Sequence, residues 1–135
     1  MGVLRIKDGV SLCDPTDYPQ ALVAPAGFRL LGSIDRVLRT KPYDLWLTSG
    51  TDGTHSGPAD PHKLGEAYDL GNHAVSLDEH RLFVHALIRD LMEADDTLFV
   101  TSGGWATNHF FAFVEDPGTP NQHIHCQRRK GTVYP

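Results

Sequence analysis

The segment of residues 60–70 combines a histidine and an aspartate at a spacing that suits metal binding. It reads Asp-Pro-His-Lys-Leu-Gly-Glu-Ala-Tyr-Asp-Leu, so His62 precedes a predicted strand, Asp69 lies on it, and Gly65 makes the turn between them. Alternate residues of a strand share a face, so Ala67 and Asp69 are expected to point the same way. The small side chain of Ala67 then leaves room for an ion beside the carboxylate.

A second pair of imidazoles lies near the end of the chain. Residues 122–126 read Gln-His-Ile-His-Cys, which on a strand places His123 and His125 on one face and sends Ile124 to the core. Imidazole and carboxylate are good zinc ligands, and three protein ligands with one open position are typical of a catalytic site. A lone His-x-His pair more often reflects ordinary surface or core polarity. The two segments together indicate a metal site far more specifically.

Hydrophobic periodicity places these segments in a small domain. Apolar residues recur at helical period over residues 28–39, and again after a capping box that begins at Ser76, in a helix expected to end near Ala94. The predicted strands are residues 45–49, 66–70, 98–101, 109–115 and 122–128. The expected fold is α+β, with a mainly antiparallel sheet of about four to five strands packed with two main helices. Residues 1–135 are expected to form one domain, with residues 1–25 as a wrapping arm that includes one short strand.

The sequence favours structural roles for two other histidines and for one tryptophan. His80 and His85 lie five apart on the second predicted helix, a spacing that does not align two ligands, and both are expected to be solvated. Trp105 follows Gly103-Gly104 in a predicted loop and is expected to pack on the sheet rather than form a substrate platform.

The bulk composition narrows the range of partners. Twelve basic residues against 17 acidic ones leave a net charge of -5, which offers no electrostatic footprint for nucleic acid or anionic lipid. No apolar run approaches the roughly 20 residues that span a bilayer, so membrane insertion is not expected. The two cysteines, Cys13 and Cys126, form no Cys-x-x-Cys pair and are interpreted as buried thiols.

The two histidine segments resemble the motifs of the zinc D-alanyl-D-alanine carboxypeptidase family, whose fold is shared with the Hedgehog signalling domain. The first segment matches histidine, two residues, glycine, one residue, alanine, one residue, aspartate, and the second matches His-x-His. The resemblance runs from about Leu45 to Gln127. It implies one Zn²⁺ ion held by His62, Asp69 and His125, with His123 beside the metal as a catalytic or transition-state-binding group.

The resemblance also implies an activity. The chain is expected to be a zinc metallopeptidase that hydrolyses a peptide bond in peptidoglycan stem peptides, as a D,D-carboxypeptidase or an endopeptidase, by means of metal-activated water. Such a hydrolase degrades cell wall in the manner of an endolysin. Residues 1–12 lack a secretory pattern. The expectation is therefore synthesis in the cytoplasm and action on the wall or periplasm after release, or within a larger phage or bacterial assembly.

Two departures from the family pattern affect the expected chemistry. One branch of the family has a glutamate base three residues before the last ligand, where this chain has Gln122. In the branch that uses His-x-His, the first histidine takes the role of that glutamate. His123 is therefore the candidate for general acid/base catalysis or oxyanion stabilisation. The family's Ser-Gly-Tyr-Arg turn is replaced by Ser-Gly-Thr-Asp-Gly-Thr-His at residues 49–55. We hypothesise that His55 contacts the substrate carboxylate or the oxyanion in place of the arginine; an ordinary loop histidine is the alternative. Asp52 in the same loop is a second candidate for substrate binding.

These departures also motivate a second hypothesis of a different class. In this hypothesis the protein retains the fold and the zinc ion but lacks catalytic activity. It would then be a zinc-stabilised binding or virion structural module. Zinc content separates both hypotheses from a metal-free domain, and cleavage of wall peptides separates them from each other.

Overall fold

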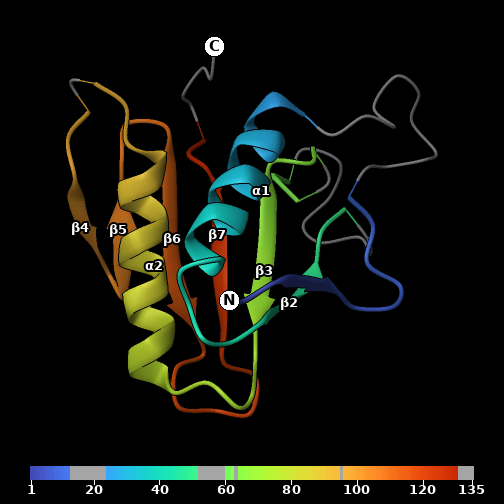
Figure 1. Cartoon of the computed structure of the whole chain (residues 1–135). Coiled ribbons are helices and arrows are strands. Elements are labelled where there is room, and N and C mark those ends of the chain that lie inside the picture. Colours follow the sequence, from blue (N-terminus) through green and yellow to red (C-terminus); the bar gives the residue numbers. More distant parts are fainter. Residues whose placement is uncertain (13–23, 52–59, 63, 95, 131–135) are drawn as a thin grey trace.

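The computed structural model describes residues 1–12, 24–51, 60–62, 64–94 and 96–130. Within these ranges the chain forms two helices and seven strands (Figure 1). In chain order the elements are β1 (Leu4–Ile6), α1 (Pro25–Leu38), β2 (Leu45–Ser49), β3 (Ala67–Gly71), α2 (Leu77–Leu91), β4 (Phe99–Thr101), β5 (Gly104–Ala106), β6 (Phe110–Glu115) and β7 (His123–Arg128). In this part of the chain neither helix has the length and apolarity that crossing a bilayer requires.

All seven strands belong to one sheet, in the order β1-β2-β3-β7-β6-β5-β4. The β1–β2 pair is parallel and the other five pairs are antiparallel. Both helices cover the same face of the sheet (Figure 1). The α+β class and the two main helices are therefore confirmed, and the sheet is mixed.

The expected count of four to five strands is wrong. The short strand expected in the first 25 residues joins the sheet by pairing Leu4–Ile6 with β2. A further strand, β5, occupies residues expected to be loop, because Gly103 adopts a φ of 79° that closes a turn between β4 and β5. Gly104 suits this strand because a side chain there would collide with the backbone of Ala112 on β6.

The hydrophobic core lies between the helices and the covered face of the sheet. Leu30 and Ile34 on α1 and Leu87 and Ile88 on α2 are completely buried in it. Each such side chain contributes roughly 1.5–3 kcal/mol through its removal from water. The predicted helix start at Ser76 is confirmed, since its hydroxyl accepts a hydrogen bond from the backbone N–H of Glu79 at 3.1 Å.

Strand alternation separates the core from the polar residues of the sheet. On β3, Tyr68 and Leu70 are buried in the core, and on β7, Ile124 and Cys126 are buried beside them. Their neighbours in sequence project to the face that the helices leave uncovered. The buried-thiol interpretation of Cys126 is confirmed, whereas Cys13 lies outside the described residues.

One histidine expected at the surface is buried instead. His80 is 1% exposed, and its Nδ1 lies 2.8 Å from the backbone carbonyl of Ser76. His85 is partly buried against Trp105, with ring centroids 4.8 Å apart. Both histidines belong to the helix-covered side of the sheet, so the expectation that they are solvated is wrong and the packing role of Trp105 is confirmed.

Candidate functional site

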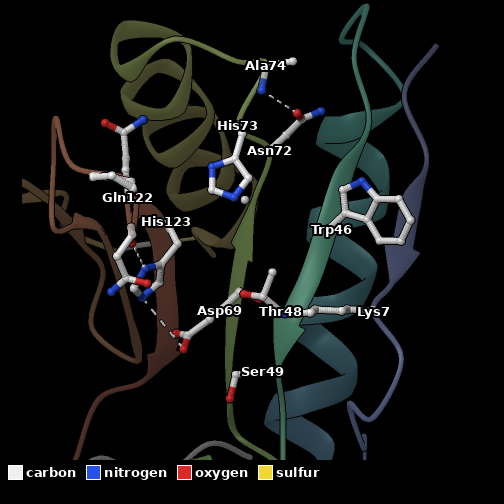
Figure 2. A pocket seen from close by; sticks show the side chains of 13 residues that line it. Lys7, Trp46, Thr48, Ser49, Asp69, Asn72, His73, Ala74, Gln122 and His123 are labelled. Atoms are coloured by element: carbon white, nitrogen blue, oxygen red, sulfur yellow. Dashed lines mark hydrogen bonds and ion pairs between the residues drawn. The ribbon is translucent and has the colours of Figure 1, made fainter.

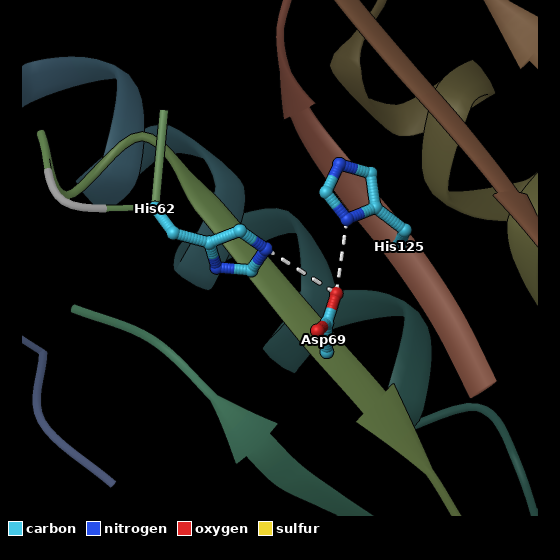
Figure 3. Close-up of side chains that lie close together, drawn as sticks. All are labelled: His62, Asp69 and His125. Carbon is cyan, nitrogen blue, oxygen red and sulfur yellow. Dashed lines mark hydrogen bonds and ion pairs between the residues drawn. The ribbon is translucent and has the colours of Figure 1, made fainter. Parts of the chain in front are cut away.

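The register between β3 and β7 places Asp69 directly opposite His125. Both side chains project from the uncovered face of the sheet. His62 reaches the same point from the preceding turn, in which Gly65 has a φ of 71° and its N–H donates to the carbonyl of His62 at 3.1 Å. Asp60 fixes this turn because its carboxylate accepts from the backbone N–H of His62 at 2.9 Å. Figure 3 shows both rings directed at the Asp69 carboxylate.

The three side chains predicted as ligands lie within metal-binding distance of one another. His62 Nε2 is 3.5 Å and His125 Nδ1 is 2.9 Å from Asp69 Oδ1. All three ligand atoms lie within 4.8 Å of each other. Ligand atoms held about 2.1 Å from a tetrahedral zinc ion lie about 3.4 Å apart, so the cluster is compatible with one ion.

The outer nitrogen of each of these rings lies against a carbonyl oxygen. His62 Nδ1 is 3.2 Å from the carbonyl of Gly50, and His125 Nε2 is 2.7 Å from Oε1 of Gln127. The amide of Gln127 is itself fixed, because its Nε2 donates to the carbonyl of Arg128 at 2.9 Å. When the outer nitrogens donate, the neutral rings present their lone pairs to Asp69, which is the arrangement of ligating histidines.

Burial and hydrogen bonding act against each other on these groups. Burial raises the pKa of the Asp69 carboxyl, but hydrogen bonds from His125 and His62 outweigh it and hold that pKa well below its usual range. Burial lowers the pKa of His125, but its hydrogen bonds to Asp69 and Gln127 outweigh this and raise the pKa above its ordinary value. A carboxylate facing two ring nitrogens thus favours a positive charge between them, carried by a proton or by a metal ion.

His123 lies beside this cluster, as the sequence predicts. Its Nε2 is 3.9 Å from Asp69 Oδ2 and 2.9 Å from Glu115 Oε1, and its Nδ1 is 2.6 Å from the backbone carbonyl of Asn121. Glu115, which pairs with His123 in the β6–β7 register, was not predicted from the sequence. The alternation in residues 110–115 indicates the face of Glu115, but not the residue opposite it.

Gln122, at the position of the family's glutamate, stabilises the β6–β7 turn. Its Oε1 accepts from the backbone N–H of Gly118 at 2.8 Å, and its Nε2 lies 3.5 Å from His80 Nδ1. The amide is thus held by the turn and lies against the core. Asp52 and His55, the predicted substrate-binding residues, lie outside the described residues.

A groove of about 740 Å³ on the uncovered face leads to Asp69 and His123 (Figure 2). Lys7 and side chains of β2, including Trp46, line one side of it, and β3, the start of β7 and the segments that follow β3 and precede β7 line the rest. Lys7 is the only lysine or arginine that lines the groove in the part of the chain that the structure describes.

Two aromatic side chains lie on the other side of the cluster formed by His62, Asp69 and His125. Phe113 and Phe111 on β6 lie with their ring centroids 5.4 Å and 6.0 Å from that of His125. Two apolar rings beside a polar cluster keep water away from one side of it, which strengthens the local electrostatic interactions.

The chain was compared with protein-family models, with curated proteins and with solved structures, and none of the three comparisons found a match. What these side chains do must therefore be inferred from their geometry and chemistry.

The stability of the metal-free protein is expected to depend on pH through the Asp69–His125 pair. Because the pKa of Asp69 is lowered, its contribution is present above its unfolded pKa of roughly 3.9 and is lost as the pH falls through the folded value. Because the pKa of His125 is raised, its contribution is complete below roughly pH 6.5 and is lost as the pH rises through the folded value. Urea titrations of chelator-treated protein should show the largest loss of stability in Asp69→Asn between about pH 4 and pH 6.5.

The matched control for this titration is Asp78→Asn, which makes the same substitution at an exposed position of α2. It should change the free energy of unfolding little at any pH. A loss in Asp69→Asn that is constant from pH 4 to pH 9 would contradict the assigned pair.

Proposed function

We propose that this chain is a zinc-dependent metallopeptidase that hydrolyses peptide bonds of peptidoglycan stem peptides. The observation that carries the proposal is the convergence of His62, Asp69 and His125, with the outer nitrogen of each ring held by a carbonyl oxygen. Two imidazoles and one carboxylate suit zinc better than magnesium or calcium, which prefer all-oxygen sites. Three protein ligands also leave a position for water or substrate.

Zinc in such a site supplies Lewis-acid activation of water and of a carbonyl group. The chain contributes the proton-transfer group. His123 Nε2 faces the uncovered side of the cluster, where it can take a proton from the attacking water and return it to the leaving amine. The carbonyl of Asn121 accepts from Nδ1 of the neutral ring, which leaves Nε2 free to take the proton, and Glu115 Oε1 accepts from Nε2 once it is protonated. In its protonated state the same ring stabilises a developing oxyanion.

The groove supports a peptide substrate with a free carboxylate. Its single lysine, Lys7, is exposed, and the backbone N–H of Lys7 donates to the carbonyl of Leu47 at 3.1 Å, which fixes the residue at the end of β1. An ammonium there attracts the terminal carboxylate of a stem peptide. A D,D-carboxypeptidase step uses such a terminus, whereas an endopeptidase cut does not require it.

One observation favours the second candidate, a zinc-stabilised binding or structural module without catalysis. The side chain of Gln122 is held by Gly118 and lies against His80. The residue at the position of the family's glutamate therefore has a structural role in this chain. In that case the metal would stabilise the sheet, and the groove would bind wall peptide without cleaving it.

The principal test is hydrolysis by the zinc-loaded protein. We expect release of alanine from D-Ala-D-Ala-terminated stem peptides, or cleavage of purified sacculi, which a chelator abolishes and added zinc restores. Asp69→Asn is expected to lose activity and tight zinc binding, whereas Asp78→Asn retains both. Stoichiometric zinc without any cleavage would support the binding module, and cleavage that persists in excess chelator would contradict the metal mechanism.

A separate prediction concerns His123. His123→Ala removes the proton-transfer group, and kcat is expected to fall by about 10² to 10⁴. Zinc binding by His62, Asp69 and His125 should persist. His85→Ala, on the helix-covered side of the sheet, is the histidine control and should retain wild-type kcat. An unchanged kcat in His123→Ala would exclude its catalytic role.

A third variant tests the role of the lysine. Lys7→Ala is expected to raise KM about tenfold for substrates with a free terminal carboxylate, with kcat little changed, which corresponds to about 1.4 kcal/mol of binding energy. The effect should disappear for the matching carboxamide substrate and be smaller in Lys7→Arg. Lys130→Ala, at an exposed position outside the groove lining, controls for loss of charge. Equal effects on carboxylate and carboxamide substrates would contradict the role of Lys7.

A further inference from the structure

A second group of potential ligands adjoins the first and shares one residue with it. Asp69, Glu115 and His123 present ligand atoms that all lie within 4.8 Å of one another. His123 Nε2 is 2.9 Å from Glu115 Oε1 and 3.9 Å from Asp69 Oδ2. The first group uses the other oxygen of the same carboxylate, Asp69 Oδ1. Asp69 therefore directs Oδ1 at His62 and His125 and Oδ2 at His123.

The ring of His123 has the same arrangement as the two rings of the first group. Its Nδ1 lies 2.6 Å from the backbone carbonyl of Asn121, and when that nitrogen donates, the lone pair of the neutral ring is on Nε2. The Asn121 side chain is held in turn, because its Nδ2 donates to the Asp116 carboxylate at 2.7 Å. The β6–β7 turn thus orients the Nε2 lone pair of His123 towards two carboxylates.

The charge around this second group also favours a cation. Asp69 and Glu115 are both acidic, and within the described ranges each forms ion pairs only with histidines. The side chains of His123 and Asp69 are 16% and 17% exposed, so water screens them only in part. Two partly shielded carboxylates beside one imidazole therefore provide a suitable donor set for a divalent cation.

We infer that Asp69, Glu115 and His123 form a second divalent-metal site, with the Asp69 carboxylate bridging two ions. The donor set of one imidazole and two carboxylates suits zinc and similar transition metals. Carboxylate-bridged pairs of ions about 3.5–4 Å apart are a common arrangement in hydrolytic enzymes. The second site is the weaker one, because its Glu115 side chain is 43% exposed and must lose side-chain freedom on binding.

The second ion has a functional consequence, which rests on the proposed function. Binding at Nε2 of His123 takes the lone pair that proton transfer requires. Activity is therefore expected to rise with the first equivalent of zinc and to fall as the second site fills.

The experiment is a zinc titration of the full, chelator-stripped chain by isothermal calorimetry, with elemental analysis after equilibrium dialysis. Wild-type protein is expected to bind two zinc ions, the second at least tenfold more weakly. Glu115→Gln should keep the first ion and weaken the second at least tenfold. Glu93→Gln makes the same substitution at an exposed residue after α2 and should match wild type. In the cobalt-loaded protein, a carboxylate bridge should couple the two ions magnetically, which electron paramagnetic resonance detects.

Wild-type binding of a single ion at saturating zinc would overturn the second site, whether or not the variants fold. Equal binding of two ions by wild type and Glu115→Gln would also overturn it. These outcomes are distinct from failure of the proposed function. Two bound ions without hydrolysis would support the second metal site and contradict the peptidase activity. Hydrolysis with one bound ion would support the peptidase activity and contradict the second metal site.

Discussion

The antiparallel pairing of β3 with β7 is the constraint on which the candidate site depends. It places Asp69 opposite His125, and it buries Tyr68 and Ile124 from the same two strands in the core. A shift of one residue would exchange the two faces of a strand, sending imidazoles into the core and apolar side chains into water. Burial of the apolar residues therefore fixes the positions of the polar ones. The free energy that holds the candidate ligands in position therefore comes from apolar burial on the helix-covered face of the sheet.

The asymmetric coverage of the sheet makes this arrangement possible. Both helices pack on one face, so the other face can carry a charged cluster without the full cost of burying it. The cluster is nevertheless partly shielded, since the side chains of His62, Asp69 and His125 are 7%, 17% and 13% exposed. Partial shielding strengthens the attraction of a carboxylate and two imidazoles for a cation. The outer carbonyl acceptors then decide which nitrogen of each ring is available.

Local patterns in the sequence predicted a metal site, the two helices and the face of each site strand, and the family resemblance implied the ligand set. These depend on spacings within a few residues, such as the two positions from Ala67 to Asp69 and from His123 to His125. The contribution of Glu115 depends on its pairing with His123 across two strands, which residues 116–122 do not specify from sequence alone. Gln127 lies two residues after His125 on the same strand, so the spacing gives its face, but it does not reveal that the amide accepts from the ring. The burial of His80 was missed because helical spacing gives the face of a residue but not what packs on it. The strand β5 was missed because Gly103-Gly104 resembles a loop, although one glycine makes the turn and the other belongs to the strand.

The seven residues between β6 and β7 determine the surroundings of His123 but do not hold His62, Asp69 or His125 in place. The three candidate ligands, His62, Asp69 and His125, are anchored by β3, β7 and the turn at Gly65, and none of them belongs to this connection. The surroundings of His123 are set by it, through the carbonyl of Asn121 and the register that brings Glu115 into contact. Changes of length or sequence in one surface connection therefore alter the contacts of His123 while leaving the positions of His62, Asp69 and His125 intact. Such a division gives evolution, or an engineer, a short exchangeable segment with which to diversify chemistry on a constant scaffold.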